Sequence, residues 1–166
     1  MMHHLRGTLN GMSDNVPWLS AEEERSWRAF IRLQQRLSRR LTAGLQAQSG
    51  LSGADFEILV ALTDVTDGRV RFQDLAEDID WERSRLSHQV ARMIKRGLVA
   101  REECAEDGRG AFVVITAQGR EVIEAAAPKH VVTVRRLVVD ALGPDDLAEL
   151  GRISGRILEQ LDAEPG

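Results

Sequence analysis

The sequence predicts a mainly α-helical protein with a small β-hairpin (α+β), and three observations support this fold class. Between residues 72 and 96, apolar residues recur at spacings of three and four in two short runs, which is typical of two short amphipathic helices. Two strand-like segments follow at residues 98–101 and 112–116, with turn-forming residues at 107–110 between them. Longer helical patterns flank this unit on both sides.

The two short helices are expected to pack on each other, because neither can bury much apolar surface alone and only a tight break separates them. Asp80 in the break tolerates a left-handed backbone, and Ala76 is small where the helices would cross. Such a pair followed by a hairpin is a winged helix-turn-helix, expected over about residues 52–116. The apolar stripes are Leu75, Ala76 and Ile79 on the first helix, and Leu86, Val90, Met93 and Ile94 on the second.

The second helix, expected over residues 82–96, turns a polar and cationic face away from its apolar stripe. Hydrogen-bond donors and cations suit the base edges and phosphates of double-stranded DNA. Arg85 is the first candidate for guanine, because its planar guanidinium can donate two hydrogen bonds to one base. The predicted DNA-binding residues are Ser84, Arg85, Ser87, His88, Gln89, Arg92 and Lys95 on the helix, and Asp107 and Arg109 at the hairpin tip.

Several segments resemble the MarR family of bacterial transcriptional regulators, over about residues 19–161. They are Trp81-Glu-Arg-Ser-Arg-Leu-Ser-His-Gln-Val-Ala-Arg-Met93, Arg96-Gly-Leu-Val99, Asp107-Gly-Arg109 and Ile115-Thr116. The resemblance implies homodimers whose recognition helices enter major grooves, wing arginines that reach minor grooves, and small ligands that weaken DNA binding. Two residues depart from the common pattern: Asp80 stands where a glycine is usual, and Glu82 stands where a serine cap is usual.

The flanking helices are expected to form a dimerisation layer over about residues 20–48 and 117–162. Ser20 suits the cap of the first helix, Pro128 should kink the second near Ala125, and Gly143-Pro144 should start a third. Their apolar stripes exceed what the winged unit can cover, so the expected partner is a second copy on a near-palindromic DNA site. Residues 1–18 are predicted to be a disordered leader, and residues 19–162 a single domain.

Charge is uneven along the 166 residues, whose formal net charge is −4. Residues 81–101 carry five Arg and one Lys against one Glu, whereas residues 140–166 carry seven acids against two Arg. A cationic segment in an acidic chain indicates a local DNA-binding face rather than a nonspecific basic coat. The single cysteine excludes an intramolecular disulfide, and no apolar run could span a bilayer, so a cytoplasmic protein with no membrane partner is expected.

Four side chains have more than one interpretation. Cys104 is interpreted first as a small apolar packing residue, because its acidic neighbours make the thiol less nucleophilic. An oxidant sensor at Cys104 is the alternative. His88 is interpreted as a DNA-facing hydrogen-bonding group rather than a general base or a metal ligand with His130. His130 is interpreted as a partly buried structural histidine rather than a ligand-pocket residue. Trp27 is a packing group first and a wall for an aromatic ligand second. No catalytic pairing or metal-ligand spacing occurs in the sequence, so no enzyme activity, metal or cofactor is expected.

These observations predict a homodimeric, sequence-specific DNA-binding protein, and the resemblance implies a transcriptional regulator, expected to be a repressor released by a small aromatic or phenolic effector. Two alternatives stay open from the sequence. One is a redox-responsive regulator that acts through Cys104. The other is a dimeric interaction module whose winged helix no longer binds DNA.

Overall fold

The N-terminal half of the predicted dimerisation layer is one long helix. The computed structural model describes residues 16–103 and 110–164, so most of the expected leader lies outside the described residues. The chain divides into two units, residues 1–36 and residues 37–166. Helix α2 (Ala21–Ser49) begins in the first unit and ends in the second, which confirms the helix expected over residues 20–48.

In the first unit, helix α2 begins with a capping box. The Ser20 backbone N–H donates to the Glu23 carboxylate at 2.7 Å, and the Glu23 backbone N–H donates to the Ser20 hydroxyl at 3.3 Å. One turn later, the rings of Trp27 and Phe30 lie 5.8 Å apart, and both side chains are well exposed. The first unit therefore leaves aromatic surface open to solvent.

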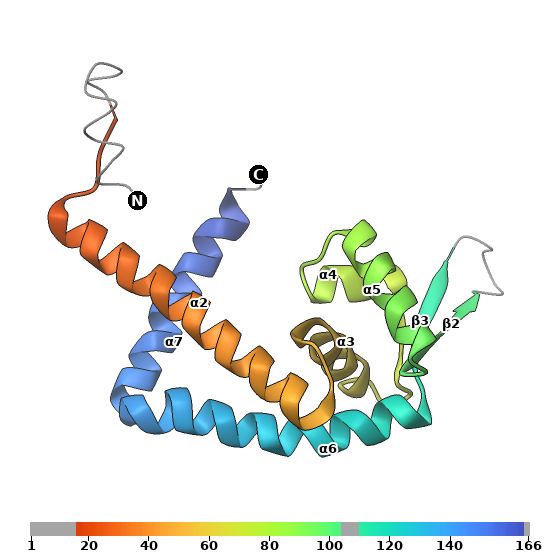
Figure 1. The fold of residues 1–166 in the computed structure, drawn as a ribbon. Coiled ribbons are helices and arrows are strands. Elements are labelled where there is room, and N and C mark those ends of the chain that lie inside the picture. The colour runs from red at the N-terminus through yellow and green to blue at the C-terminus, as the bar shows by residue number, and fades with distance from the viewer. Residues whose placement is uncertain (1–15, 104–109, 165–166) are drawn as a thin grey trace. The chain divides into compact units, whose positions relative to one another are not determined.

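The second unit contains the winged helix-turn-helix expected over residues 52–116 (Figure 1). A three-stranded antiparallel sheet with the order β1-β3-β2 joins the short strand before the helices to the hairpin after them. Val113 at the middle of β3 pairs with Val70 on one side and Arg101 on the other. The elements are α3 (Gly53–Thr63), β1 (Arg69–Arg71), α4 (Phe72–Asp78), α5 (Arg83–Lys95), β2 (Val99–Glu103) and β3 (Ala111–Ile115).

The turn between α4 and α5 confirms the left-handed residue predicted from the sequence. Asp80 has a φ of 50°, which lets the Trp81 N–H reach back to the Ala76 carbonyl at 2.9 Å. Glu82 is the N-cap of α5, and its side chain makes no capping hydrogen bond. Gly97, with a φ of 71°, ends α5 in the left-handed conformation and sends the chain into β2.

The core lies where α3, α4, α5, the sheet and the start of α6 (Ala117–Val134) meet. One expectation about α5 is wrong. Ile94 was assigned to its buried stripe, but its side chain is 39% exposed, while Gln89 is buried on the opposite flank of that stripe. The largest fully buried apolar side chains are Leu51, Ile58, Leu59, Leu62, Leu75, Leu86, Met93, Val99 and Val113.

The C-terminal helices follow the hairpin directly. Helix α6 packs against α3 and continues as one helix through Pro128 (Figure 1). The departure from regular α-helix comes later than the kink expected near Ala125, in a π-helical turn η1 (Arg135–Val139). Helix α7 (Asp140–Ala163) contains the expected interruption at Gly143, where φ is 75° and ψ is 173°. None of the described helices combines the length and apolar character needed to cross a membrane.

Candidate nucleic-acid interface

Helix α5 presents a continuous polar face to solvent. No acidic residue lies in its first turn, and two cations lie in its last. Ser and His hydrogen-bonding groups lie between the cations, so the face offers both charge and donors. The side chains that the structure places on this face are Ser84, Arg85, Ser87, His88, Arg92 and Lys95, all exposed. Their contact with DNA stays a prediction.

Arg85 is held in place at the start of α5 by an aromatic ring. Its guanidinium carbon lies 3.7 Å from the centroid of the Trp81 ring, within cation–π distance. Trp81 is 8% exposed and belongs to the hydrophobic core, so the ring is a fixed platform. Arg85 is therefore exposed on α5 with one face of its guanidinium against the Trp81 ring.

Gln89 does not belong to the exposed face, and its predicted orientation toward solvent is wrong. Its side chain is 3% exposed because α3 packs against this flank of α5. The Gln89 Nε2 donates to Asp55 Oδ1 at 2.6 Å, and the Gln89 Oε1 accepts a hydrogen bond from Arg92 Nη2. The amide is thus used within the protein, and only its partner Arg92 reaches the surface.

Asp55, which the sequence did not single out, is the buried end of this arrangement. Its side chain is 1% exposed and accepts hydrogen bonds from the Ser52 N–H at 2.8 Å and from Arg96 Nη1 at 2.6 Å. Burial alone would raise the pKa of Asp55, but the hydrogen bonds from Ser52 and Arg96 and the Arg96 charge outweigh it, so the pKa lies below its ordinary value. Asp55 is therefore a buried carboxylate that keeps its charge. The Ser52-x-x-Asp55 spacing signals a helix cap, but nothing in it signals partners 34 and 41 residues away.

The two outer strands of the sheet, β1 and β2, carry further arginines. The Arg69 guanidinium lies 3.3 Å from the centroid of the Phe112 ring and its Nε bonds Glu102 at 3.1 Å. Arg101 lies near the ring of Phe72, at 5.9 Å from its centroid. Three proposed functional residues of the hairpin, Cys104, Asp107 and Arg109, lie outside the described residues.

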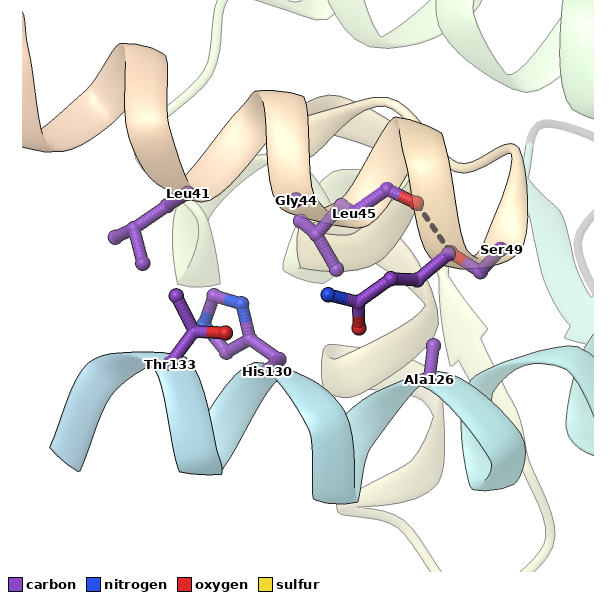
Figure 2. A pocket seen from close by; sticks show the side chains of 8 residues that line it. Leu41, Gly44, Leu45, Ser49, Ala126, His130 and Thr133 are labelled. Atoms are coloured by element: carbon purple, nitrogen blue, oxygen red, sulfur yellow. Dashed lines mark hydrogen bonds between the residues drawn. The ribbon is translucent and has the colours of Figure 1, made fainter. Parts of the chain in front are cut away.

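A narrow crevice separates the end of α2 from α6 (Figure 2). Leucine side chains of α2 face His130 and Ala126 of α6 across it, and the crevice has no room for a water-sized molecule. The centroids of the His130 and Phe56 rings lie 4.5 Å apart, and burial lowers the pKa of His130. His130 is thus partly buried, as predicted. Its neighbours offer no metal site, and no group of three or more potential metal-binding side chains occurs in residues 16–103 and 110–164.

Comparisons with known proteins agree with this geometry. A family model described as MarR family matches residues 49–110. AbsC, a MarR family transcriptional regulator from Streptomyces coelicolor, is 40% identical with a TM-score of 0.85, and the match covers 90% of this chain and 100% of AbsC. The chain belongs to the MarR family. This family consists of transcriptional regulators and not of enzymes.

Two further relatives match this MarR-family chain over different lengths. Sco3205 from Streptomyces coelicolor, solved in complex with DNA, is 40% identical with a TM-score of 0.85, over 90% of this chain and 93% of Sco3205. The transcriptional regulator HosA of Escherichia coli O127:H6 is 51% identical over 43 residues, which are 26% of this chain. The chain matches about a third of the length of this curated relative (32%). The likeness to Sco3205 extends over nearly the whole fold, whereas the likeness to HosA is confined to a short segment.

Proposed function

We propose that this MarR-family chain binds double-stranded DNA sequence-specifically as a homodimer and represses transcription until a small ligand releases it. The observation that carries this proposal is the exposed polar and cationic face of α5, which a helix-turn-helix and a sheet hold outward. The DNA complex of Sco3205, a relative with 40% identity, supports the same role for this chain. In the proposed complex α5 enters the major groove.

The proposed contacts divide by chemistry. Arg85, Ser84, Ser87 and His88 lie on the N-terminal half of α5 and are assigned to base edges, with Arg85 donating to guanine. The two cations of the last turn, Arg92 and Lys95, are assigned to phosphates. Arg109 is assigned to the minor groove, with Asp107 as its orienting partner, on the sequence alone.

Homodimerisation is supported by apolar surface that the described chain leaves uncovered. Helix α7 has no buried residue, although several large apolar side chains lie on it at helical spacing. A soluble monomer rarely keeps so much apolar surface on one helix face. A second copy related by two-fold symmetry would cover this face and would place two α5 helices on a near-palindromic site.

The crevice between α2 and α6 is the proposed ligand site. Its walls combine apolar groups with the polar heads of Gln48, Ser49 and Thr133, which suits a small aromatic or phenolic molecule. His130 also lines the crevice, so in this proposal it would contact the ligand, contrary to its interpretation from the sequence as a structural histidine only. Because the crevice is closed, such a ligand would enter only if α6 and the end of α2 moved apart. That movement would shift α3, which packs on α6 and also contacts α5.

The proposed function is tested by selecting a preferred DNA site from a random library and measuring its affinity across a salt series. If the cations of α5 contact phosphates, the logarithm of the association constant should fall with the logarithm of salt concentration by about 0.9 for each phosphate neutralised. Arg92→Ala should reduce that slope by about one. The matched control is Arg152→Ala on α7, which removes an exposed arginine from an ion pair with Glu149 and should leave the slope unchanged. Absence of a preferred site, with a flat salt dependence, would leave an interaction module as the better description.

A further inference from the structure

Two side chains with polar or charged heads, Asp55 and Gln89, are buried in the described parts of the chain, and they contact each other. Burial of such groups is costly unless every hydrogen bond is made. Here each is satisfied, because no buried side-chain nitrogen or oxygen among the described residues lacks a partner. The pair therefore forms a complete polar connection between α3 and α5 inside an apolar core.

The charges at the two ends fix the direction of the Gln89 amide. A carboxylate only accepts hydrogen bonds, so the amide nitrogen of Gln89 must face Asp55. The amide oxygen must then face away from Asp55, and it accepts from the guanidinium of Arg92. The order is carboxylate, amide and guanidinium. The oriented dipole of the Gln89 amide thus connects the Asp55 carboxylate to a cation on the exposed face of α5.

Asp55 also holds the C-terminal end of α5, through Arg96. Arg96 follows α5 and donates to Asp55 at 2.6 Å and to the Gly50 carbonyl at 2.9 Å. Asp55 also caps α3 through Ser52. One buried carboxylate thus ties together the start of α3, the end of α5 and, through Gln89, an arginine whose side chain is exposed.

We propose that Asp55 and Gln89 are positioning residues for DNA binding, which hold the Arg92 guanidinium in the geometry of its phosphate contact before DNA arrives. This inference rests on the proposed function, because it concerns the same face of α5. A long, free arginine loses rotamer freedom when it binds, and an arginine already hydrogen-bonded to Gln89 loses less. Gln89 itself touches no DNA in this account.

The test is a double-mutant cycle on the selected DNA site. Gln89→Met keeps the side-chain volume and leaves Asp55 Oδ2 its bonds to Ser52 and Arg96, but it removes the partner of Asp55 Oδ1, so the fold should persist with a lower stability. It should weaken specific binding about 3- to 10-fold by freeing Arg92. In an Arg92→Ala background the same change should have no further effect, because the residue through which it acts is gone. In a Lys95→Ala background, the matched control on the same helix, the two losses should multiply.

A merely structural role gives a different result. If Gln89 only packs α5 against α3, Gln89→Met should weaken binding equally in the wild-type and Arg92→Ala backgrounds, and this outcome would overturn the inference while leaving the proposed function intact. Unchanged affinity in Gln89→Met would overturn it as well. If the wild-type chain binds no DNA, both proposals fall.

A measurement without DNA separates the loss of Arg92 ordering from poor folding of a variant. The Nε–H group of Arg92 should be ordered in NMR relaxation of the wild-type protein and mobile in Gln89→Met. Asp55→Asn keeps an acceptor oxygen for the Ser52 cap. It should also loosen Arg92, because it removes the carboxylate charge that orients the Gln89 amide. An equally ordered Arg92 in all three proteins would sink the inference.

Discussion

Arg85 and the ring beneath it show how one residue of α5 is prepared for base recognition. Because Trp81 covers one face of the guanidinium, few rotamers remain for Arg85, and less conformational entropy is lost on binding. Arg85→Ala should therefore cost about 1–3 kcal/mol at the selected DNA site and less on random DNA. Fluorescence anisotropy with both DNA types measures the difference.

Arg85→Lys is the informative control for this prediction. Lysine keeps the charge but offers neither the planar face for Trp81 nor two parallel donors. It should restore binding to random DNA more fully than binding to the selected site. Equal losses on both kinds of DNA in Arg85→Ala would instead assign Arg85 to a phosphate.

His130 makes the fold sensitive to pH in a defined window. Burial lowers its pKa in the folded protein below the ordinary histidine value of about 6.5, so the folded state binds fewer protons than the unfolded state as pH falls through this region. Its contribution to stability is therefore fully present above the unfolded pKa and is lost as pH falls toward the lowered folded pKa. Thermal unfolding of wild type and His130→Gln between pH 8 and 5 should show a steeper loss of midpoint in wild type. Parallel curves would contradict this account.

At the scale of elements, the first turn of α6 is fixed by its contact with the end of α5. The Thr116 hydroxyl caps α6 and donates to the Gly97 carbonyl at 2.6 Å, while Gly119 is buried against Leu98. A Cβ built on Gly119 would lie 2.0 Å from the Leu98 carbonyl oxygen, which is backbone and cannot rotate away. Gly119→Ala should thus destabilise the protein by about 1–3 kcal/mol in urea denaturation.

Gly44→Ala is the matched control for that prediction. A Cβ at Gly44 has the Gln48 side chain as its nearest heavy atom, at 4.0 Å, an ordinary contact. Since alanine is a better helix former than glycine, this change should stabilise α2 by roughly 0.5–1 kcal/mol. If both substitutions behaved alike, close backbone approach at Gly119 would not be the cause.

Sequence periodicity located the helices and strands of the winged unit because each has one apolar face and a clear stop, such as Gly97. It failed at the flanks of α5. Leu86, Val90 and Met93 define the centre of the buried stripe, and Gln89 and Ile94 lie on its two sides. Which side is covered depends on where α3 packs, and the buried Asp55 that selects Gln89 comes from a distant part of the chain. Periodicity within one helix contains no such information.

At the scale of the whole molecule, the uncovered face of α7 predicts the oligomeric state. Leu150, Ile153, Ile157, Leu158 and Leu161 are all at least 37% exposed and fall on one side of the helix at helical spacing. Ile157→Glu places a charge at the centre of this stripe and removes about 1.5–3 kcal/mol of apolar burial for each copy. Light scattering should show a dimer for wild type and a monomer for this variant. Ala148→Glu, which adds the same charge on the opposite side of α7, should remain dimeric.

Dimerisation and DNA reading are linked by geometry, because two α5 helices related by a two-fold axis must meet the same side of the duplex. Half-site centres should therefore lie about one helical turn apart, roughly 34 Å or 10 base pairs. Inserting about 5 base pairs between the half-sites turns one of them to the far side of the DNA, so affinity should fall toward that of a single half-site. Ile157→Glu should bind the original and the lengthened site with similar, low affinity, since a monomer reads one half-site at a time. Changing the sequence of the spacer without changing its length is the control, and its effect should be small. If the wild-type protein bound both spacings equally well, each copy would be reading DNA independently, and the two-fold arrangement would be wrong.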